Sequence, residues 1–179
     1  MLMNPGAVYR LAARIGVLCQ LALVNSAAFA QETDVHPTEQ TFSDWRVLCQ
    51  PTEEEAVCQM LQSVSAEENG LPVFLLSVSD DEDTDQSYAV MTVPVGVYLA
   101  PGIELHVDNR RPFKVLYEVC DQLGCHAGFR MDGDVLSAFR KGLIVNARVW
   151  TARDKAVEFP ISLRGFTAAY TQFSADGGN

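Results

Sequence analysis

The stretch Tyr117–Phe129 reads YEVCDQLGCHAGF, and it sets the framework for the rest of the chain. The residues before Cys120 and after Cys125 favour β-strands, and the four residues between the two cysteines favour a tight turn. Two cysteines at the two ends of such a turn can be joined by a disulfide bond. The stretch therefore predicts a β-hairpin closed by a covalent bond, near the middle of the folded part of the chain.

The first 30 residues have the three parts of a secretory signal. Arg10 and Arg14 precede an apolar run over 15–28, which ends in Ala28-Phe29-Ala30. A basic start, an apolar middle and a small-x-small exit are typical of a signal peptide, and the run is too short to span a membrane. We therefore expect residues 1–30 to be removed on export, leaving no transmembrane segment.

The remaining 149 residues are enough for one domain with a substantial core. We expect a flexible N-terminal arm over 31–40, because this segment is polar and shows no apolar period. We expect a single β-sandwich domain over 41–173 and a disordered polar tail over 174–179.

Acidic residues dominate the exported part of the chain. It carries 11 bases and 23 acids, a net charge of −12. Nucleic-acid partners need a basic face, so this composition argues against them. The charges are uneven: residues 31–85 contain fourteen acids and one base, whereas residues 110–164 contain ten bases and six acids. The two halves either meet different partners or simply keep the protein in solution.

Short β-like segments follow one another along the domain, separated by turns rich in proline, glycine and charge. Turn signals about every 8–12 residues are typical of a β-sandwich, with a barrel as the alternative. Pro94, which lacks an N–H, is expected to divide the longest segment into two strands. The expected strand segments are Thr41–Gln50, Ala56–Ser65, Leu71–Ser79, Ser87–Gly102, Ile103–Val107, Phe113–Val119, Cys125–Met131, Leu143–Ala152 and Val157–Leu163.

Two short helices are expected near the C-terminus. The first covers 135–141, with Asp134 as its N-cap and Gly142 as its C-cap. The second covers Ser162–Phe173, where apolar residues recur at i, i+3, i+4 and i+7, and Ser162 would cap it.

Four cysteines remain after export, because Cys19 lies in the signal segment. An even number in a secreted chain predicts disulfides, and four cysteines permit three connectivities. Cys49 and Cys58 flank one predicted hairpin turn, just as Cys120 and Cys125 flank another. We therefore favour the pairs Cys49–Cys58 and Cys120–Cys125.

No motif in the chain indicates a cofactor or a catalytic site. The cysteine spacings match neither a redox Cys-x-x-Cys motif nor a zinc site, and Cys120…Cys125-His126 is longer than the usual haem-attachment motif. Nucleophile elbows, zinc-protease motifs and phosphate loops are missing from the sequence. We expect a non-enzymatic protein without cofactor. A periplasmic enzyme of unknown class, or a haem or metal carrier using Cys120, Cys125 and His126, remains the alternative.

Two charged turns are the candidate partner-binding sites. The run DDEDTDQ over 80–86 has the first three spacings of a calcium loop, but its sixth position is not glycine and its twelfth is not glutamate. We interpret it as a solvated acidic loop. Loops on a rigid scaffold are where binding residues concentrate. The candidates are Asp81, Asp83 and Asp85 in this loop, and Arg110 and Arg111 in the turn over 108–112.

Five short motifs occur in order across 45–166. They are Trp45-x3-Cys49, Cys58-x-Met60-x-Gln62, Val93-Pro94-Val95-Gly96-Val97, Tyr117-x2-Cys120-x3-Gly124-Cys125 and Pro160-x2-Leu163-x-Gly165-Phe166. With these motifs behind a signal segment, the chain resembles the invasion-associated locus B family of secreted bacterial proteins.

The resemblance carries several implications. It implies an all-β, immunoglobulin-like β-sandwich in the periplasm, the outer envelope or the secreted fraction of a Gram-negative bacterium. It implies a structural role for the four cysteines and no known catalytic residue. The family name comes from a link to host-cell invasion and virulence. We therefore expect an interaction module with a protein partner in the envelope or on a host surface.

Overall fold

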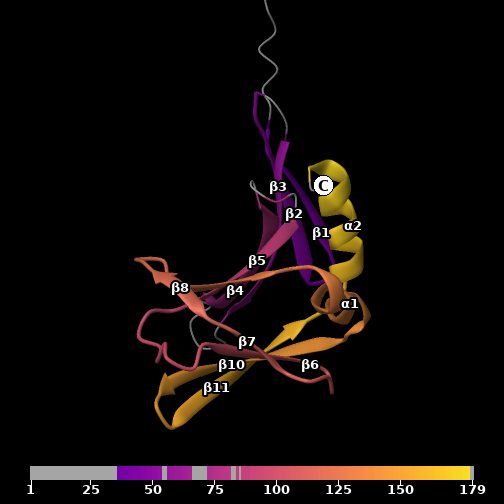
Figure 1. The fold of residues 1–179 in the computed structure, drawn as a ribbon. Helices are drawn as coiled ribbons and strands as arrows, with labels where there is room; N and C mark the ends of the chain where they lie inside the picture. The colour runs from indigo at the N-terminus through magenta and orange to yellow at the C-terminus, as the bar shows by residue number, and fades with distance from the viewer. Residues whose placement is uncertain (1–35, 54–55, 66–71, 82–83, 85, 178–179) are drawn as a thin grey trace, which may run out of the picture. The chain divides into compact units, whose positions relative to one another are not determined.

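The computed structural model describes residues 36–53, 56–65, 72–81, 84 and 86–177 (Figure 1). The predicted signal segment, residues 31–35 of the predicted arm, and Asp83 and Asp85 of the acidic loop lie outside these residues. The part that the structure describes is mostly β, in two antiparallel sheets with two short helices near the C-terminus. This architecture confirms the expected all-β fold class and is consistent with an immunoglobulin-like sandwich.

In the part of the chain that the structure describes, the larger sheet contains seven strands, and each strand runs antiparallel to its neighbours. Its inner face consists of the residues that alternate into the core, such as Trp45, Val47 and Cys49. One-sided burial of this kind is what the alternating sequence pattern predicts. In spatial order the strands are β1 (Thr38–Phe42), β2 (Trp45–Pro51), β3 (Ala56–Ser65), β4 (Pro72–Asp81), β5 (Gln86–Val93), β9 (Cys125–Arg130) and β8 (Tyr117–Cys120).

The smaller sheet contains four strands and packs on the inner face of the larger one. In order they are β11 (Lys155–Ser162), β10 (Ile144–Ala152), β6 (Ile103–Val107) and β7 (Phe113–Val115). Two aromatic contacts join the sheets: Phe159 stacks with Phe74 of β4, and Phe113 meets Phe129 of β9 edge-on. The sandwich core lies between these layers.

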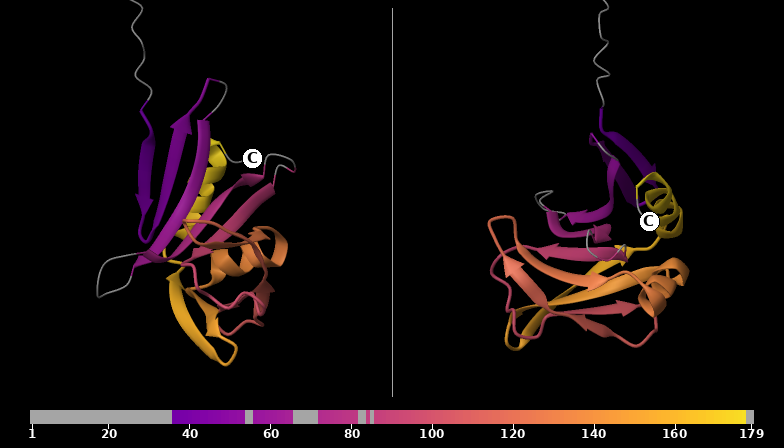
Figure 2. Two further views of the ribbon diagram at one scale, coloured as in Figure 1. Left: turned by 90° about the vertical axis from the view of Figure 1, so that its left-hand side faces the viewer. Right: turned by 45° about the horizontal axis from the view of Figure 1, so that its top comes forward.

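The C-terminal helix covers the part of the large sheet that the small sheet leaves open. Helix α2 (Phe166–Asp176) contacts β1, β2 and β3, and α1 (Gly133–Lys141) contacts α2 (Figure 2). The ring of Phe166 meets Trp45 edge-on at 5.1 Å, and the indole N–H of Trp45 donates to the carbonyl of Ser162 at 3.0 Å. The helix therefore completes the core over β1–β3.

Several expected boundaries differ from the structure at the ends of the domain. The predicted arm was to extend through Gln40, but residues 38–40 already belong to β1, which pairs with β2. The predicted tail was to begin at Ser174, but α2 continues to Asp176. The helix begins at Phe166 rather than after Ser162, because Ser162 is still paired with Ile144 in β11. Helix α1 has Asp132, not Asp134, at its N-cap.

Two predicted strands are interrupted in the middle of the chain. Strand β5 ends at Val93, and the segment after Pro94 forms turns rather than the second strand that was expected. The segment 113–119 divides at Leu116, because β7 belongs to the small sheet and β8 to the large one. Leu116 is 67% exposed at this crossing point. The alternating pattern continues through Leu116, so the sequence alone does not show the change of sheet.

Candidate functional site

The hairpin between β8 and β9 is closed as the sequence predicts, by a disulfide between Cys120 and Cys125. The two cysteines are directly opposed cross-strand partners. Inside the turn, the Asp121 carboxylate accepts hydrogen bonds from the N–H groups of Leu123 at 2.7 Å and Gly124 at 3.2 Å. Gly124 is required here, since a Cβ at its position would clash with the carbonyl oxygen of Val93. The turn is therefore held rigidly against the end of β5.

A straight row of side chains crosses the outer face of the large sheet beside this turn. Direct cross-strand partners share a face of a sheet. Ser63 of β3 opposes Leu75 of β4, Leu75 opposes Thr92 of β5, Thr92 opposes His126 of β9, and His126 opposes Val119 of β8. The row thus connects the middle of the sheet to its edge strand.

A groove of about 480 Å³ lies over four of these residues. The outer face of the sheet forms its floor through Ser63, Leu75, Thr92 and His126, and Pro94 and Leu123 also line it. Leu123 is 84% exposed, and Val119, next along the row, is 57% exposed. Large apolar side chains that are exposed together on a folded protein commonly mark an interaction site. We call this feature the outer-face groove.

A hydrogen-bonded chain fixes the histidine in the floor of the groove. Nε2 of His126 lies 3.1 Å from Oδ1 of Asp121, and Nδ1 lies 2.9 Å from the Thr92 hydroxyl. A carboxylate only accepts hydrogen bonds, so Nε2–H donates to Asp121 and, in the neutral ring, Nδ1 accepts from Thr92. The hydrogen bond from His126, followed by that from the Leu123 N–H, lowers the pKa of the Asp121 carboxyl.

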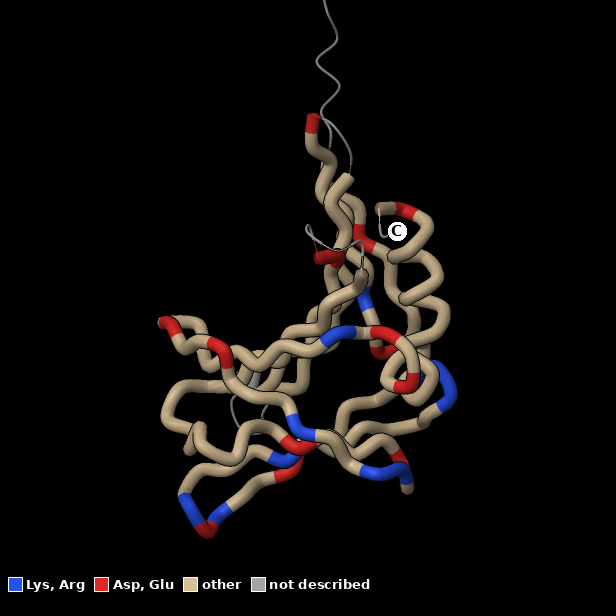
Figure 3. The backbone as a smooth tube through the Cα atoms, in the orientation of Figure 1, with Lys and Arg blue, Asp and Glu red and all other residues tan. Residues whose placement is uncertain are grey.

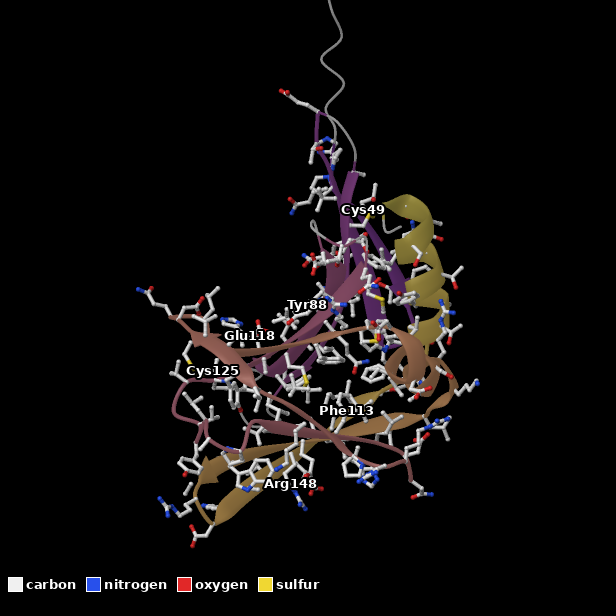
Figure 4. The ribbon with its side chains drawn as sticks, viewed as in Figure 1. Cys49, Tyr88, Phe113, Glu118, Cys125 and Arg148 are labelled. Atoms are coloured by element: carbon white, nitrogen blue, oxygen red, sulfur yellow. A yellow bond between two sulfur atoms is a disulfide. The ribbon has the colours of Figure 1, made fainter. Side chains whose placement is uncertain are left out.

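A second side-chain contact ties β8 to β5 on the same face. The Tyr88 hydroxyl donates to Glu118 at 2.5 Å, and the Tyr88 ring lies so close to Gly128 that a Cβ there would clash with it. Figure 4 shows Tyr88 and Glu118 next to each other, close to Cys125. The hydrogen bond to Glu118, together with burial, raises the pKa of Tyr88 to about 12. The edge strand is thus fixed by a disulfide and by a side-chain brace.

The order carboxylate, imidazole, hydroxyl is also found where a hydroxyl acts as a nucleophile. Such a site additionally needs N–H donors for the oxyanion. The N–H groups of the adjacent turn, those of Leu123 and Gly124, donate to Asp121 instead. Thr92 itself is fixed within a strand that is paired on both sides. The geometry therefore favours a role for the chain of hydrogen bonds in holding the groove.

The disulfide also argues against the alternative function as a haem or metal carrier that the sequence left open. Cys120 and Cys125 are joined to each other, so neither offers the thiolate that metal binding or haem attachment requires. Both ring nitrogens of His126 are engaged with protein partners. Among the residues with described positions, no three His, Cys, Asp or Glu side chains form a cluster that could hold a metal ion.

The charged candidates from the sequence lie elsewhere in the fold. Asp81 ends β4 and pairs with Gln86 across the β4–β5 hairpin, while Asp83 and Asp85 lie outside the described residues. Arg110 and Arg111 occupy the turn between β6 and β7 of the small sheet, where they line a second pocket. Asp81 and the two arginines therefore belong to different sheets.

The groove residues Ser63, Leu75, Thr92, Pro94 and Leu123 are not among the candidates that the sequence suggests. Their proximity depends on strand register, which brings residues up to 63 positions apart onto one line. One signal in the sequence could have pointed to the site. Leu123 is a large apolar residue in the middle of a tight turn, where polar residues are the rule.

Comparisons with known proteins agree with the fold. The model of the "Invasion associated locus B (IalB) protein" family matches residues 45–174. Two curated proteins, both named "Invasion protein B homolog" and from two strains of Brucella abortus, are 27% identical over 157 residues, which is 86% of this chain and 90% of theirs. None of the helices in the described ranges is long and apolar enough to cross a membrane.

The crystal structure of invasion associated protein B from Bartonella henselae has the same fold. It superposes with a TM-score of 0.67 at 22% identity, covering 77% of this chain and 95% of that one. The family match spans most of the chain, including both disulfides and the whole outer-face groove. The chain belongs to the invasion-associated locus B family.

Proposed function

We propose that this protein is an exported, non-enzymatic binding module that acts in the periplasm, on the outer envelope or outside the cell. Two observations support export: the signal-like segment over 1–30 and two disulfides, which persist in oxidising compartments. The family name suggests that the partner takes part in the invasion of host cells.

The outer-face groove is the binding site that we favour. The observation that carries this choice is the exposed Leu123, which lines a groove of about 480 Å³ and lies on a turn fixed by a disulfide. Pockets of a few hundred Å³ with apolar walls and a few polar groups are typical of specific binding sites. A rigid anchor loses little conformational entropy on binding, so each buried apolar contact contributes more to affinity.

The partner is a protein that inserts one or two apolar side chains. Leu75, Pro94 and Leu123 offer apolar walls, and the Ser63 hydroxyl offers a hydrogen bond to a backbone. The Thr92 hydroxyl, which donates to His126, can still accept one from a backbone N–H. Asp81 and the acidic loop are secondary candidates, which would steer a basic partner to this sheet.

Site-specific photocrosslinking tests the proposal. A photoreactive amino acid replaces Leu123 in the protein exported by its own bacterium, and the same amino acid replaces the exposed Ala168 of α2 as the control. We expect a defined protein adduct from position 123 and none from position 168. A second change in the floor, Leu75→Glu, should reduce the adduct about tenfold or more, since central apolar contacts carry most binding energy.

The choice of site is wrong if positions 123 and 168 give the same adducts, or if Leu75→Glu leaves the adduct at position 123 unchanged while circular dichroism shows a native fold. Asp121, His126 and the disulfide are unchanged in these variants, so the bonds that hold the turn are retained.

A further inference from the structure

Another pocket lies on the small sheet, away from the outer-face groove. It has a volume of about 520 Å³, between the β6–β7 turn and helix α1. Its apolar surface comes from Val107, Phe113, Val135 and Ala138, and Arg110 and Arg111 line it together with the hydroxyl-bearing Ser137. We call it the arginine pocket.

The two arginines in this pocket differ from most others in the protein. Arg46, Arg148 and Arg164 form ion pairs with acidic side chains, Arg130 donates to Gln86, and Arg140 lies over the ring of Tyr170. The side chains of Arg110 and Arg111 form no ion pair or hydrogen bond with any residue in the described ranges. Two guanidinium groups are thus left with their donors unused beside a pocket.

The nearest acid in sequence does not neutralise them. The carboxylate of Asp108 accepts hydrogen bonds from the N–H groups of Leu143 and Ile144, at 3.0 to 3.1 Å. Among the described residues, Asp134 is the one acid that lines the pocket, and it lies beyond ion-pair distance of both arginines. The lining therefore carries two positive charges against one negative charge, in a chain whose net charge is −10.

The turn that carries the arginines is fixed before any ligand binds. The N–H of Asp108 donates to the carbonyl of Ile144 at 3.0 Å, and the N–H of Arg110 donates to that of Val107 at 2.9 Å. Together with the Asp108 carboxylate, these bonds hold the turn to the start of β10. Pro112 restricts the backbone directly after the pair. Figure 3 shows Lys and Arg segments around the small sheet and α1, with the β6–β7 turn among them.

We propose that the arginine pocket binds a small organic anion, in which a carboxylate or phosphate group is attached to an apolar or aromatic body. Guanidinium groups bind both anions through paired N–H donors. The apolar body would lie against Phe113, Val135 and Ala138, and the Ser137 hydroxyl can add a further hydrogen bond. The inference is independent of the outer-face groove, which is on the other sheet.

NMR titration of the exported, oxidised protein with three probes tests the inference. Phenyl phosphate carries both the anion and the apolar body, inorganic phosphate carries the anion alone, and benzyl alcohol carries the body alone. We expect saturable binding of phenyl phosphate with a Kd of about 1 mM, and at least about tenfold weaker binding of the other two probes. The amide signals of Ser137 and Ala138 should shift.

Matched variants distinguish binding in the arginine pocket from non-specific attraction of the anion to positive charge. The double variant Arg110→Gln/Arg111→Gln should weaken phenyl phosphate binding about tenfold or more. Arg153→Gln removes positive charge from an exposed turn of the same sheet and should change nothing. Benzoate in place of phenyl phosphate identifies which anion is preferred, and binding of either supports the proposal.

Three outcomes would overturn the inference. They are no saturable binding of phenyl phosphate or benzoate, equal binding of inorganic phosphate, or equal losses in the Arg153 variant and the double variant. The photocrosslink from position 123 should persist in the double variant, so the two proposals fail separately.

Discussion

Two hairpins in this fold are each closed by a disulfide bond, and the two bonds have different structural roles. Cys49–Cys58 joins β2 to β3, and Cys120–Cys125 joins β9 to β8, in both cases between directly opposed residues with Cα atoms 4.0 Å apart. The first hairpin lies inside the large sheet, whereas the second ends at the edge strand β8. Figure 4 shows Cys49 and Cys125 at separate places along this sheet.

The surroundings of the two disulfides explain the difference. Cys49 and Cys58 are only 7% and 3% exposed and belong to the core that α2 covers. In the second pair Cys125 is 3% exposed, but Cys120 is on the surface. The first bond reinforces a core that already has an aromatic cluster around Trp45 and Phe166. The second fixes a surface turn that has little core of its own, and so shapes the outer-face groove.

Removing each disulfide should separate these roles, and it has the largest expected effect. Cys49→Ala/Cys58→Ala opens the longer loop and removes buried sulfur atoms, so we expect it to lower the free energy of unfolding by about 3–4 kcal/mol. Cys120→Ala/Cys125→Ala opens a shorter loop and should cost about 2 kcal/mol. Urea denaturation of the two purified variants measures both values.

The two variants should have the opposite order of effect on the photocrosslink from position 123. We expect the Cys120/Cys125 variant to lose it, and the Cys49/Cys58 variant to keep it at a temperature where that variant is folded. If both variants keep the crosslink, the second disulfide does not shape the groove. If the second variant is the less stable one, the comparison between a core hairpin and a surface hairpin is wrong.

How far the sequence predicted the molecule depends on whether a feature is local. The β-rich architecture, the pairing of Cys49 with Cys58 and of Cys120 with Cys125, and the alternating burial of Ile103, Leu105 and Val107 all follow from residues close in sequence. Their signals are periodicity and the positions of cysteines around turns.

The features that the sequence did not predict depend on contacts between distant segments. The break at Leu116 follows from which sheet accepts β7 and which accepts β8. The start of α2 at Phe166 follows from the pairing of Ser162 with Ile144, and the outer-face groove follows from register across the four strands β3, β4, β5 and β9. Arg110 and Arg111 were singled out by charge alone, and only the fold places them beside a pocket.

The hydrogen bond between Tyr88 and Glu118 fixes the edge hairpin, as the packing of α2 fixes the core hairpin. Its loss should affect stability less than removal of a disulfide and more than loss of the Asp121 charge. The folded state raises the Tyr88 pKa from 10.0 to about 12, which means that it favours the neutral phenol. This contribution to stability is present below pH 10 and is lost as the pH rises from 10 towards 12. Glu118→Gln should bring the Tyr88 pKa back towards 10.0.

Ultraviolet titration of tyrosinate absorbance measures this change. Tyr117 is the internal control, because burial alone raises its pKa to about 12 and Glu118 is not among the causes. We expect the pKa of Tyr88 to fall in the Glu118→Gln protein, while Tyr117 keeps its high pKa. An unchanged titration curve would show that the brace does not hold β8 in solution.

The smallest expected effect concerns the charge of Asp121, at the centre of the surface turn. Hydrogen bonds from His126 and from the turn's N–H groups lower its pKa in the folded state, so ionised Asp121 favours folding. This contribution is present above the unfolded pKa of about 4 and is lost as the pH falls through the lower, folded value. Because the carboxyl is on the surface, the loss should be small.

Asp121→Asn keeps an acceptor oxygen for the N–H groups of Leu123 and Gly124 but removes the charge next to His126. We expect this variant to lose less stability than the parent between about pH 5 and pH 3, measured as the shift of the urea midpoint. Asp154→Asn, in the β10–β11 turn, makes the same charge change away from the groove and should follow the parent. If Asp121→Asn also follows the parent, the disulfide alone holds the turn, and the hydrogen-bonded chain through His126 to Thr92 adds nothing to it.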